Sequence, residues 1–337
     1  MNQKPNNNIA VIGAGAWGTA LAQVLAEAGR NVTLYARASE LAAAINQSHE
    51  NTVYLPGVAL NPRIHATSYL AEAAKNADIL LLVTPSQFIR NLLSKLKPHL
   101  PPRVPLVNCA KGIEVTTGKF LSEVAAEIVP DAPYAVLSGP TFAHEVARGL
   151  PAAVTFATAA PKQQAQAWAQ ALSGKTFRPY LSGDPTGAEI AGAVKNVIAI
   201  ACGIVEGRRL GQNAKAAVMT RGIAEIKRLG MKSGAEADTF LGLSGIGDLT
   251  LTCHSMSSRN YSLGVELGQG HKLQDILSKR LTVTEGITTA RAIATHAHKM
   301  GVEMPISAAV DRVLHHAADI SGVIDELLAR DLKQESH

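Results

Sequence analysis

The chain has 337 residues, and single hydrophobic cores seldom grow beyond about 250–300 residues, so two domains are expected. Hydrophobic residues make up 47% of the sequence and aromatic residues only 4%, which predicts a core of Ala, Val, Ile and Leu. The net charge is +5, but the Lys and Arg residues are scattered, without a basic run or interleaved aromatics. This pattern argues against a nucleic-acid partner and favours a protein that binds anionic small molecules.

The three cysteines, Cys109, Cys202 and Cys253, are few, odd in number and far apart. Such spacing predicts neither a disulfide framework nor a zinc site, and it is typical of a reducing compartment. The segment Met1–Asn8 is polar and lacks the apolar core of a signal peptide, and no run approaches the roughly 18–20 apolar residues of a membrane span. We therefore expect a cytoplasmic protein with no membrane span and no metal site.

Residues 8–21 carry the first functional signal. A short apolar run ends in Gly13-x-Gly15-x-x-Gly18, and an Ala- and Leu-rich helix follows as far as Gly29. In a dinucleotide-binding βαβ unit, the first glycine permits a tight turn, the second lets the backbone approach a pyrophosphate, and the third lets the helix pack on its strand. A purely structural glycine turn has the same spacing, but a second apolar strand predicted at 31–36 favours nucleotide binding.

The end of that second strand bears on the choice of cofactor. An NAD-selective site usually places Asp or Glu there to hold the ribose 2′-hydroxyl, whereas this chain has Arg37. A guanidinium suits the 2′-phosphate of NADP(H), so NADP(H) is favoured over NAD(H). The alternative is that Arg37 is only an exposed residue at the end of a strand.

Strands and helices continue to alternate through the first half of the chain. Further strands are predicted at 78–83, 105–109, 134–137, 152–157 and 176–179, helices at 39–47, after 86 to about 97, and at 161–172, and a loop at 49–62. Ligands of open α/β sheets collect at the carboxyl ends of the strands. Lys111 and the turn Ser138–Ala143 follow two of these strands and are therefore candidate site residues.

The sequence changes character at Asp184, a candidate N-cap followed by Pro185 at the first helical position. From there the pattern predicts only helices, at 185–206, 213–229, 235–241, 258–267, 286–300, 305–316 and 322–332. The predicted fold class is α/β, with an N-terminal Rossmann-type doubly wound sheet at 1–184 and an all-α C-terminal domain at 185–337. Because the helices of the second domain are rich in small residues, we also predict a homodimer formed through it.

Lys195 lies in the middle of the long apolar helix predicted at 185–206. A lysine is costly to bury unless it is paired. Either its ammonium group reaches the surface along the helix, or it faces a cleft with a pKa tuned for proton transfer. The sequence does not decide between these two interpretations.

Two later segments carry further candidates. Residues 243–252 form a predicted glycine-rich loop with one carboxylate, Asp248, which either holds a lysine ammonium or substrate hydroxyls, or caps a helix. Ser258 is a candidate N-cap of the next helix, with Arg259 directly after it. The free N–H groups of a helix start and an arginine fork together make a phosphate site, although an ordinary capped helix with an exposed arginine has the same sequence.

Together these segments resemble a known family. In order along the chain they are Gly13-Ala14-Gly15-Ala16-Trp17-Gly18, Lys111-Gly112-Ile113-Glu114, Ser138-Gly139-Pro140-Thr141-Phe142-Ala143, Ala193-Val194-Lys195-Asn196-Val197, Gly245-Ile246-Gly247-Asp248-Leu249, Ser258-Arg259-Asn260 and Val283-Thr284-Glu285-Gly286. The chain resembles the bacterial-type NAD(P)-dependent glycerol-3-phosphate dehydrogenases over residues 8–330. Since several motifs agree in order and spacing, this resemblance is far more specific than the glycine fingerprint alone.

The resemblance implies reversible NAD(P)H-dependent reduction of dihydroxyacetone phosphate to sn-glycerol 3-phosphate, supplying glycerophospholipid synthesis. It implies that Lys195 is the catalytic proton donor and acceptor at the C2 oxygen. The residues that match substrate positions are Lys111, Gly139, Thr141, Lys195, Asn196, Asp248, Thr252, Ser258, Arg259 and Asn260. Those that match cofactor positions are Gly13, Gly15, Ala16, Trp17, Gly18, Arg37, Tyr54, Lys111, Ala143, Arg259, Val283 and Glu285.

Two other functions fit parts of the sequence. Dehydrogenases of the 6-phosphogluconate or 3-hydroxyacyl-CoA type share the two-domain plan, but the motifs of the former fit less well, and the latter needs a His–Glu pair after the cofactor domain that we do not find. A non-catalytic NADP sensor would bind the cofactor without turnover, and a cleft-facing Lys195 argues against it.

Overall fold

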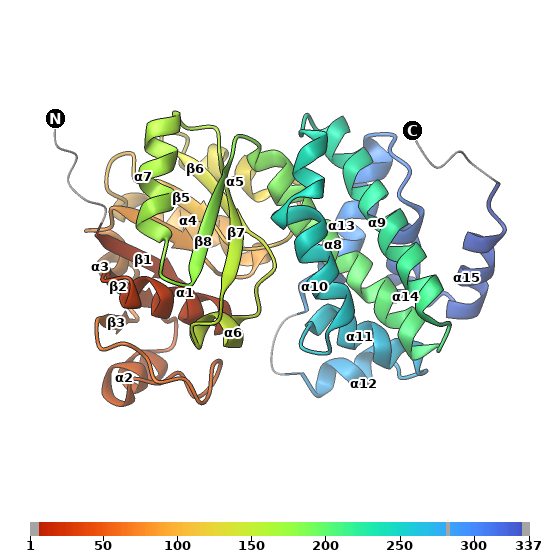
Figure 1. Cartoon of the computed structure of the whole chain (residues 1–337), viewed down its shortest axis with the longest axis horizontal. Helices are drawn as coiled ribbons and strands as arrows, with labels where there is room; N and C mark the ends of the chain where they lie inside the picture. The colour runs from red at the N-terminus through yellow and green to blue at the C-terminus, as the bar shows by residue number, and fades with distance from the viewer. Residues whose placement is uncertain (1–6, 281–283, 332–337) are drawn as a thin grey trace.

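The computed structural model describes residues 7–280 and 284–331. Figure 1 shows a sheet with helices on its faces and, beside it, a cluster of helices from α8 (Pro185–Gly207) to α15 (Ile320–Leu328). The predicted order of an α/β sheet followed by helices is confirmed. The last strand ends at Ser182, close to the domain boundary predicted at 184–185. The division into two domains itself stays a prediction.

Eight strands form one sheet, in the order β3-β2-β1-β4-β5-β6-β7-β8. Their bounds are Asn8–Ile12 (β1), Asn31–Tyr35 (β2), Ile64–Thr67 (β3), Ile79–Leu82 (β4), Leu106–Asn108 (β5), Tyr134–Ser138 (β6), Ala152–Thr158 (β7) and Phe177–Ser182 (β8). Strands β1 to β6 are parallel and follow the strand order of a dinucleotide-binding fold. β7 is antiparallel to β6 and parallel to β8, so the last two strands run in the opposite direction to the first six.

Helices cover both faces of the sheet. They are α1 (Ala16–Glu27), α2 (Ser39–Ser48), α3 (Leu70–Ala74), α4 (Ile89–Leu96), α5 (Leu121–Ile128), α6 (Ala143–Ala147) and α7 (Lys162–Leu172). Ile9 and Val11 of β1 lie in a core with α1, α2 and α7, whereas the alternate residues Ala10 and Ile12 lie in a core with α3, α4 and α5. Strands buried on both faces must be apolar at every position, which explains the continuous runs that predict them.

The strands predicted from apolar runs are all present, with their ends shifted by a few residues. The same patterns give no signal for β3, α3, α5 and α6. β3 is an edge strand with the sequence Ile64-His65-Ala66-Thr67, and its His65 side chain is exposed, so it has no continuous apolar run.

The second half of the chain is helical in its described residues. Its helices are α8, α9 (Gln212–Lys232), α10 (Asp248–His254), α11 (Arg259–Gly268), α12 (Leu273–Ser278), α13 (Glu285–Lys299), α14 (Pro305–His315) and α15. As predicted, Asp184 caps α8 by accepting a hydrogen bond from the N–H of Gly187 (2.8 Å), and Pro185 is the first helical residue. α8 has the length and mean hydropathy (1.7) of a membrane span, so the expectation that no run has this character was wrong, but 94% of its most apolar window is buried inside the protein.

The small residues of α8 allow close packing with α11. Gly203 and Gly207 of α8 face Gly264 and Gly268 of α11, and a Cβ atom on Gly264 would lie only 2.1 Å from the carbonyl oxygen of Ile200. Paired GxxxG segments let two helix backbones approach each other in this way. The small residues that prompted the homodimer prediction therefore pack two helices of the same chain against each other. The homodimer stays a prediction.

Three predictions in the helical half need correction. Residues 243–252, predicted as a loop, are helical except for a kink at Gly245, because a π-helical turn at Leu243–Gly247 leads into α10. The helix predicted at 235–241 is a short 3₁₀ turn at Ala237–Leu241. The helix predicted at 322–332 instead runs from Ile320 to Leu328, and residue 332 lies outside the described residues.

Candidate active site

The carboxyl ends of four parallel strands meet at one edge of the sheet. The glycine turn follows β1, Ser86 follows β4, Lys111 follows β5 and Gly139 follows β6. The N–H of Ser86 donates to Glu285 (3.4 Å) in the helical half, and Lys111 donates to a carboxylate of α10. This edge of the sheet therefore meets the helical half, and most of the candidate residues gather there.

The three glycines of the fingerprint have different surroundings. Gly13 has a φ of +128°, a backbone conformation that favours glycine. A Cβ atom on Gly18 would lie 1.8 Å from the carbonyl oxygen of Gly13, whereas one on Gly15 would meet no described atom within 4 Å. Gly15 caps α1 without a side-chain hydrogen bond, so the first N–H groups of this helix are available to a phosphate.

Asn51, which no sequence motif identifies, ties the loop after α2 to the glycine turn. It is fully buried and donates to the carbonyl oxygen of Ala14 (2.9 Å) and to the hydroxyl of Thr19 (2.8 Å). Its own side-chain oxygen accepts the N–H of Tyr54 (3.1 Å), whose side chain is exposed. Tyr54 is therefore held close to the turn, as a cofactor contact would require.

The other predicted cofactor residues have varied positions. Ala16 and Trp17 begin α1, and Ala143 begins α6, which packs against α1. Arg37 follows β2 and is exposed, and the described part of the chain supplies no hydrogen-bond or ion-pair partner for its side chain. The N–H of Gly13 donates to the carbonyl oxygen of Tyr35 (3.2 Å), which brings the end of β2 next to the turn. Val283 lies outside the described residues.

Lys195 is buried, so the interpretation in which its ammonium group reaches the surface is wrong. Its Nζ donates to Asp248 Oδ1 (2.6 Å) and to Thr252 Oγ1 (2.6 Å). Asp248 and Thr252 are four residues apart in α10, so the helical form of this segment presents both side chains on one face. The buried cation is thereby paired, as its cost of burial requires.

Asp248 is shared between two lysines. Its other oxygen, Oδ2, accepts a hydrogen bond from Lys111 Nζ at 2.5 Å, and Lys111 also donates to the carbonyl oxygen of Gly139 at 3.5 Å. The stem of Lys111 lies against Gly192 of α8, where a Cβ atom would be 3.5 Å from its Cγ. Because Lys111 belongs to the sheet half and Lys195 to the helical half, both halves build this centre.

The electrostatics of the centre suit proton transfer near neutral pH. Burial lowers the pKa of Lys195 to about 8, Asp248 opposes this effect, and Lys111 adds to it. Burial acts to raise the pKa of Asp248, but the two ammonium groups outweigh it and hold that pKa below its ordinary value. Two cations around one carboxylate leave a net positive charge, which favours an anionic substrate and a developing alkoxide.

The starts of α11 and α13 meet next to this centre. Ser258 caps α11, as predicted, by accepting the N–H of Tyr261 (3.2 Å). Asn260 is buried, and its side-chain oxygen accepts the N–H of Gly286 at the start of α13 (3.0 Å). A Cβ atom on Gly286 would lie 2.9 Å from the carbonyl oxygen of Asn196, which follows Lys195 in α8.

Glu285 links the charged groups of the site. Burial raises its pKa, and Arg259, Lys111 and Lys195 act in the opposite direction. These three cations therefore lie within electrostatic reach of one carboxyl group. Arg259, at the start of α11, is exposed. Among the predicted substrate residues, Thr141 donates to the carbonyl oxygen of Gly139 (3.2 Å), the same oxygen that accepts from Lys111 (3.5 Å).

Sequence profiles cover most of the chain. Residues 8–165 match the N-terminus, and residues 184–325 the C-terminus, of NAD-dependent glycerol-3-phosphate dehydrogenase. The chain belongs to this family. It is 55% identical to the glycerol-3-phosphate dehydrogenase (NAD(P)+) of Rhodospirillum rubrum, over 98% of this chain and 94% of that protein. It is 52% identical to the Caulobacter vibrioides protein of the same name, over 97% of this chain and 98% of that protein.

Solved structures of the glycerol-3-phosphate dehydrogenase family share the fold. The crystal structure from Coxiella burnetii has a TM-score of 0.93 and 35% identity, over 97% of this chain and 100% of that one. The structure from Saccharomyces cerevisiae has a TM-score of 0.83 and 28% identity, over 96% and 99%. The resemblance drawn from the motifs is therefore confirmed, and the 6-phosphogluconate and 3-hydroxyacyl-CoA alternatives lose their support.

Proposed function

We propose that this chain reduces dihydroxyacetone phosphate to sn-glycerol 3-phosphate with NADPH or NADH, reversibly, and that Lys195 is the proton donor. The observation that carries the proposal is the buried ammonium group of Lys195, held between Asp248 and Thr252 at the sheet edge that bears the glycine fingerprint. We further propose that the enzyme works in the cytoplasm and supplies glycerophospholipid synthesis.

The residues of the glycine turn fit a dinucleotide. The open space at Gly15 and the uncapped start of α1 suit a pyrophosphate, and Arg37, exposed directly after β2, is the residue that would contact a 2′-phosphate. When bound, the reduced cofactor supplies the hydride for the C2 carbonyl carbon of the substrate.

Lys195 supplies the proton for the C2 oxygen. As an ammonium it donates a proton while negative charge develops on that oxygen, and as an amine it accepts the proton in the reverse reaction. Asp248 and Thr252 hold the ammonium group in position, and Lys111 adds a second cation that stabilises the developing alkoxide.

The start of α11 holds the other end of the substrate. Ser258 occupies only one N–H of the first turn, and Arg259 adds a guanidinium fork, so a phosphate is favoured there. Binding of this remote group orients C2 against Lys195 and thereby contributes to the rate as well as to affinity.

The test is an absorbance assay at the nicotinamide band with dihydroxyacetone phosphate, run with NADPH and NADH in parallel. We expect turnover to glycerol 3-phosphate. Because reduction needs the ammonium form of Lys195, kcat/KM for reduction should fall as the pH rises through about 8, whereas the reverse oxidation should become faster over the same range. Tight NADPH binding without turnover between about pH 6 and 9 would support the NADP sensor instead.

Arg37→Asp should raise the KM for NADPH by about 30- to 1,000-fold and affect NADH much less. The change removes a charge-assisted contact and adds repulsion, together roughly 2–4 kcal/mol. The same variant assayed with NADH is the internal control. Equal effects on the two cofactors would mean that Arg37 is only an exposed residue at the end of β2.

A further inference from the structure

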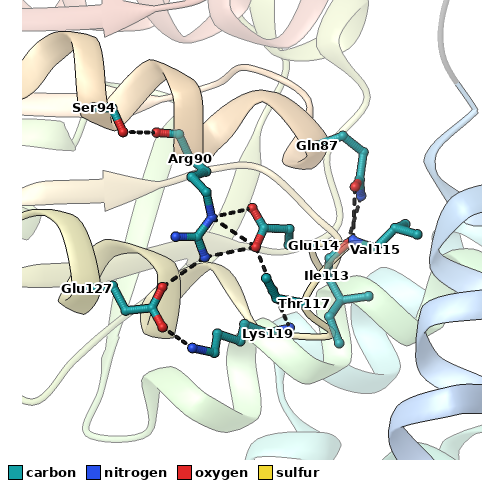
Figure 2. A network of polar contacts seen from close by, with 9 residues as sticks. All are labelled: Gln87, Arg90, Ser94, Ile113, Glu114, Val115, Thr117, Lys119 and Glu127. Carbon is teal, nitrogen blue, oxygen red and sulfur yellow. Dashed lines mark hydrogen bonds and ion pairs between the residues drawn. The ribbon is translucent and has the colours of Figure 1, made fainter.

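Glu114 ends the motif that begins at Lys111, but its side chain contacts the sheet half instead of the charged centre. Its carboxylate accepts hydrogen bonds from Arg90 Nε (2.9 and 3.1 Å) and Nη2 (2.9 Å), and from Thr117 Oγ1 (2.5 Å). Figure 2 shows this fork between α4, which carries Arg90, and the loop that carries Glu114. Glu114 is buried, and Arg90 lowers the pKa of its carboxyl group, so the pair is ionised at neutral pH.

The backbone on either side of Glu114 is also held. Gln87 donates to the carbonyl oxygen of Ile113 (2.7 Å) and accepts the N–H of Val115 (3.0 Å), as Figure 2 shows. The N–H of Glu114 donates to the carbonyl oxygen of Lys119 (2.9 Å), which closes a turn. No helix and no extended strand forms between the end of β5 at Asn108 and the start of α5 at Leu121, so these contacts fix the loop.

Lys111 lies just before the stretch Ile113–Val115 that these contacts hold, with Gly112 between them. Gly112 packs so closely on Ser86 that a Cβ atom on it would lie 2.5 Å from Ser86 Oγ. Ser86 and Arg90 belong to the same connection from β4 into α4. The path of the loop from Lys111 to Glu114 is therefore set by one segment, residues 86–90.

We infer that the Arg90–Glu114 ion pair positions Lys111, and that through Lys111 it sets how readily Lys195 releases its proton. The inference depends on the proposed roles of these two lysines. The charged and titratable groups that act on Lys195 are Asp248 and Cys253 on α10, Lys111 on the loop and Glu285 on α13. Of these groups, Lys111 is the one that lies on the loop held by the Arg90–Glu114 ion pair. Glu114 and Arg90 are thus positioning residues, since neither contacts the centre itself.

Loss of the Arg90–Glu114 ion pair should change the pKa of Lys195 in a predictable direction. If Lys111 moves away from Asp248, it repels the Lys195 ammonium less, and Asp248 is left to act on Lys195 alone. Both changes favour the ammonium form, so the pKa of Lys195 rises above about 8. In Glu114→Gln, the alkaline limb of kcat/KM for reduction should move up by about half a pH unit or more. The value at pH 7 should fall about 10-fold, because Lys111 stabilises the alkoxide less well.

Matched variants separate this effect from general destabilisation. Glu127→Gln removes a carboxylate from the same arginine, 2.9 Å from its Nη2, and from the Lys119 side chain. It leaves in place the Arg90–Glu114 fork and the backbone hydrogen bond from Glu114 to Lys119, so the pH profile and kcat/KM should not change. Arg90→Lys keeps the charge and loses the fork, so its alkaline limb should move in the same direction by less. Combined with Glu114→Gln, it should add little, because both changes disrupt one interaction.

The experiment is a pH profile of kcat/KM for dihydroxyacetone phosphate at saturating NADPH, with thermal unfolding measured for each variant. Turnover by the unchanged protein tests the proposed function separately. If that turnover is present and both Glu114→Gln and Arg90→Lys lower the unfolding temperature without moving the alkaline limb, the ion pair is purely structural and the inference fails. If Glu114→Gln does not fold, Arg90→Lys is the deciding variant. The inference then requires that the alkaline limb of its pH profile of kcat/KM moves up.

Discussion

Replacing Lys195 with alanine should lower kcat for dihydroxyacetone phosphate reduction by about 10²–10⁴ and leave NADPH affinity nearly unchanged. A loss of kcat of this size is what removal of a general acid usually causes. Lys195 hydrogen-bonds Asp248 and Thr252 in the helical half and makes no hydrogen bond to the glycine turn, so cofactor binding should not depend on it. Steady-state kinetics at saturating NADPH, together with an NADPH binding titration, check both parts.

Stability has to be measured alongside, because Lys195→Ala leaves the buried Asp248 with one lysine partner instead of two. Lys195→Arg is the matched control. It keeps the positive charge beside Asp248, but a guanidinium does not release its proton in the neutral range. This variant should therefore be inactive even where it folds well. A folded Lys195→Ala protein that retained more than about a tenth of the original kcat would move the proton role to Lys111.

The sheet is the part of the fold that is most predictable from sequence. A strand buried on both faces, such as Ile79–Leu82, is apolar at every position and has few other interpretations. The helices α3, α6 and α12 have only five or six residues, which is too short for a helical period to show. Residues 243–247 are rich in glycine, which has a low helix propensity, and they form a π-helical turn that is kinked at Gly245, where a Cβ atom would lie 2.2 Å from the carbonyl oxygen of Phe240.

The centre of the site was only partly predictable. A lysine inside an apolar helix is conspicuous, but its partner Asp248 lies 53 residues further along, and the second lysine on that carboxylate is 137 residues from it. Asn51 and Glu189 belong to no motif. Glu189 is buried and accepts from Tyr134 Oη (3.0 Å) and Ser122 Oγ (2.5 Å), which ties α8 to the sheet half. Such partners are identified by asking which buried polar groups are satisfied, and that requires the fold.

Replacing Arg259 with alanine should lower kcat/KM for dihydroxyacetone phosphate by about 30- to 5,000-fold, or roughly 2–5 kcal/mol. Arg259 follows the Ser258 cap of α11, so the guanidinium fork and the N–H groups of the helix start favour an anion at the same place. Asn260 joins this start to that of α13, and Gly286 of α13 contacts the backbone of Asn196. A phosphate held there would therefore lie next to the helix that carries Lys195.

Unphosphorylated dihydroxyacetone separates phosphate binding from the chemical step. It lacks the remote group, so it should already be a very poor substrate of the unchanged enzyme, and Arg259→Ala should affect it much less. Arg259→Lys keeps a point charge without the fork and should have an intermediate effect on the phosphorylated ketone. Arg259 also acts on Glu285 and matches a cofactor position, so NADPH must be saturating and its affinity measured separately. If Arg259→Ala lowers kcat/KM equally for both ketones under these conditions, Arg259 is not the phosphate anchor, and the assignment of Ser258 and Asn260 to the phosphate fails with it.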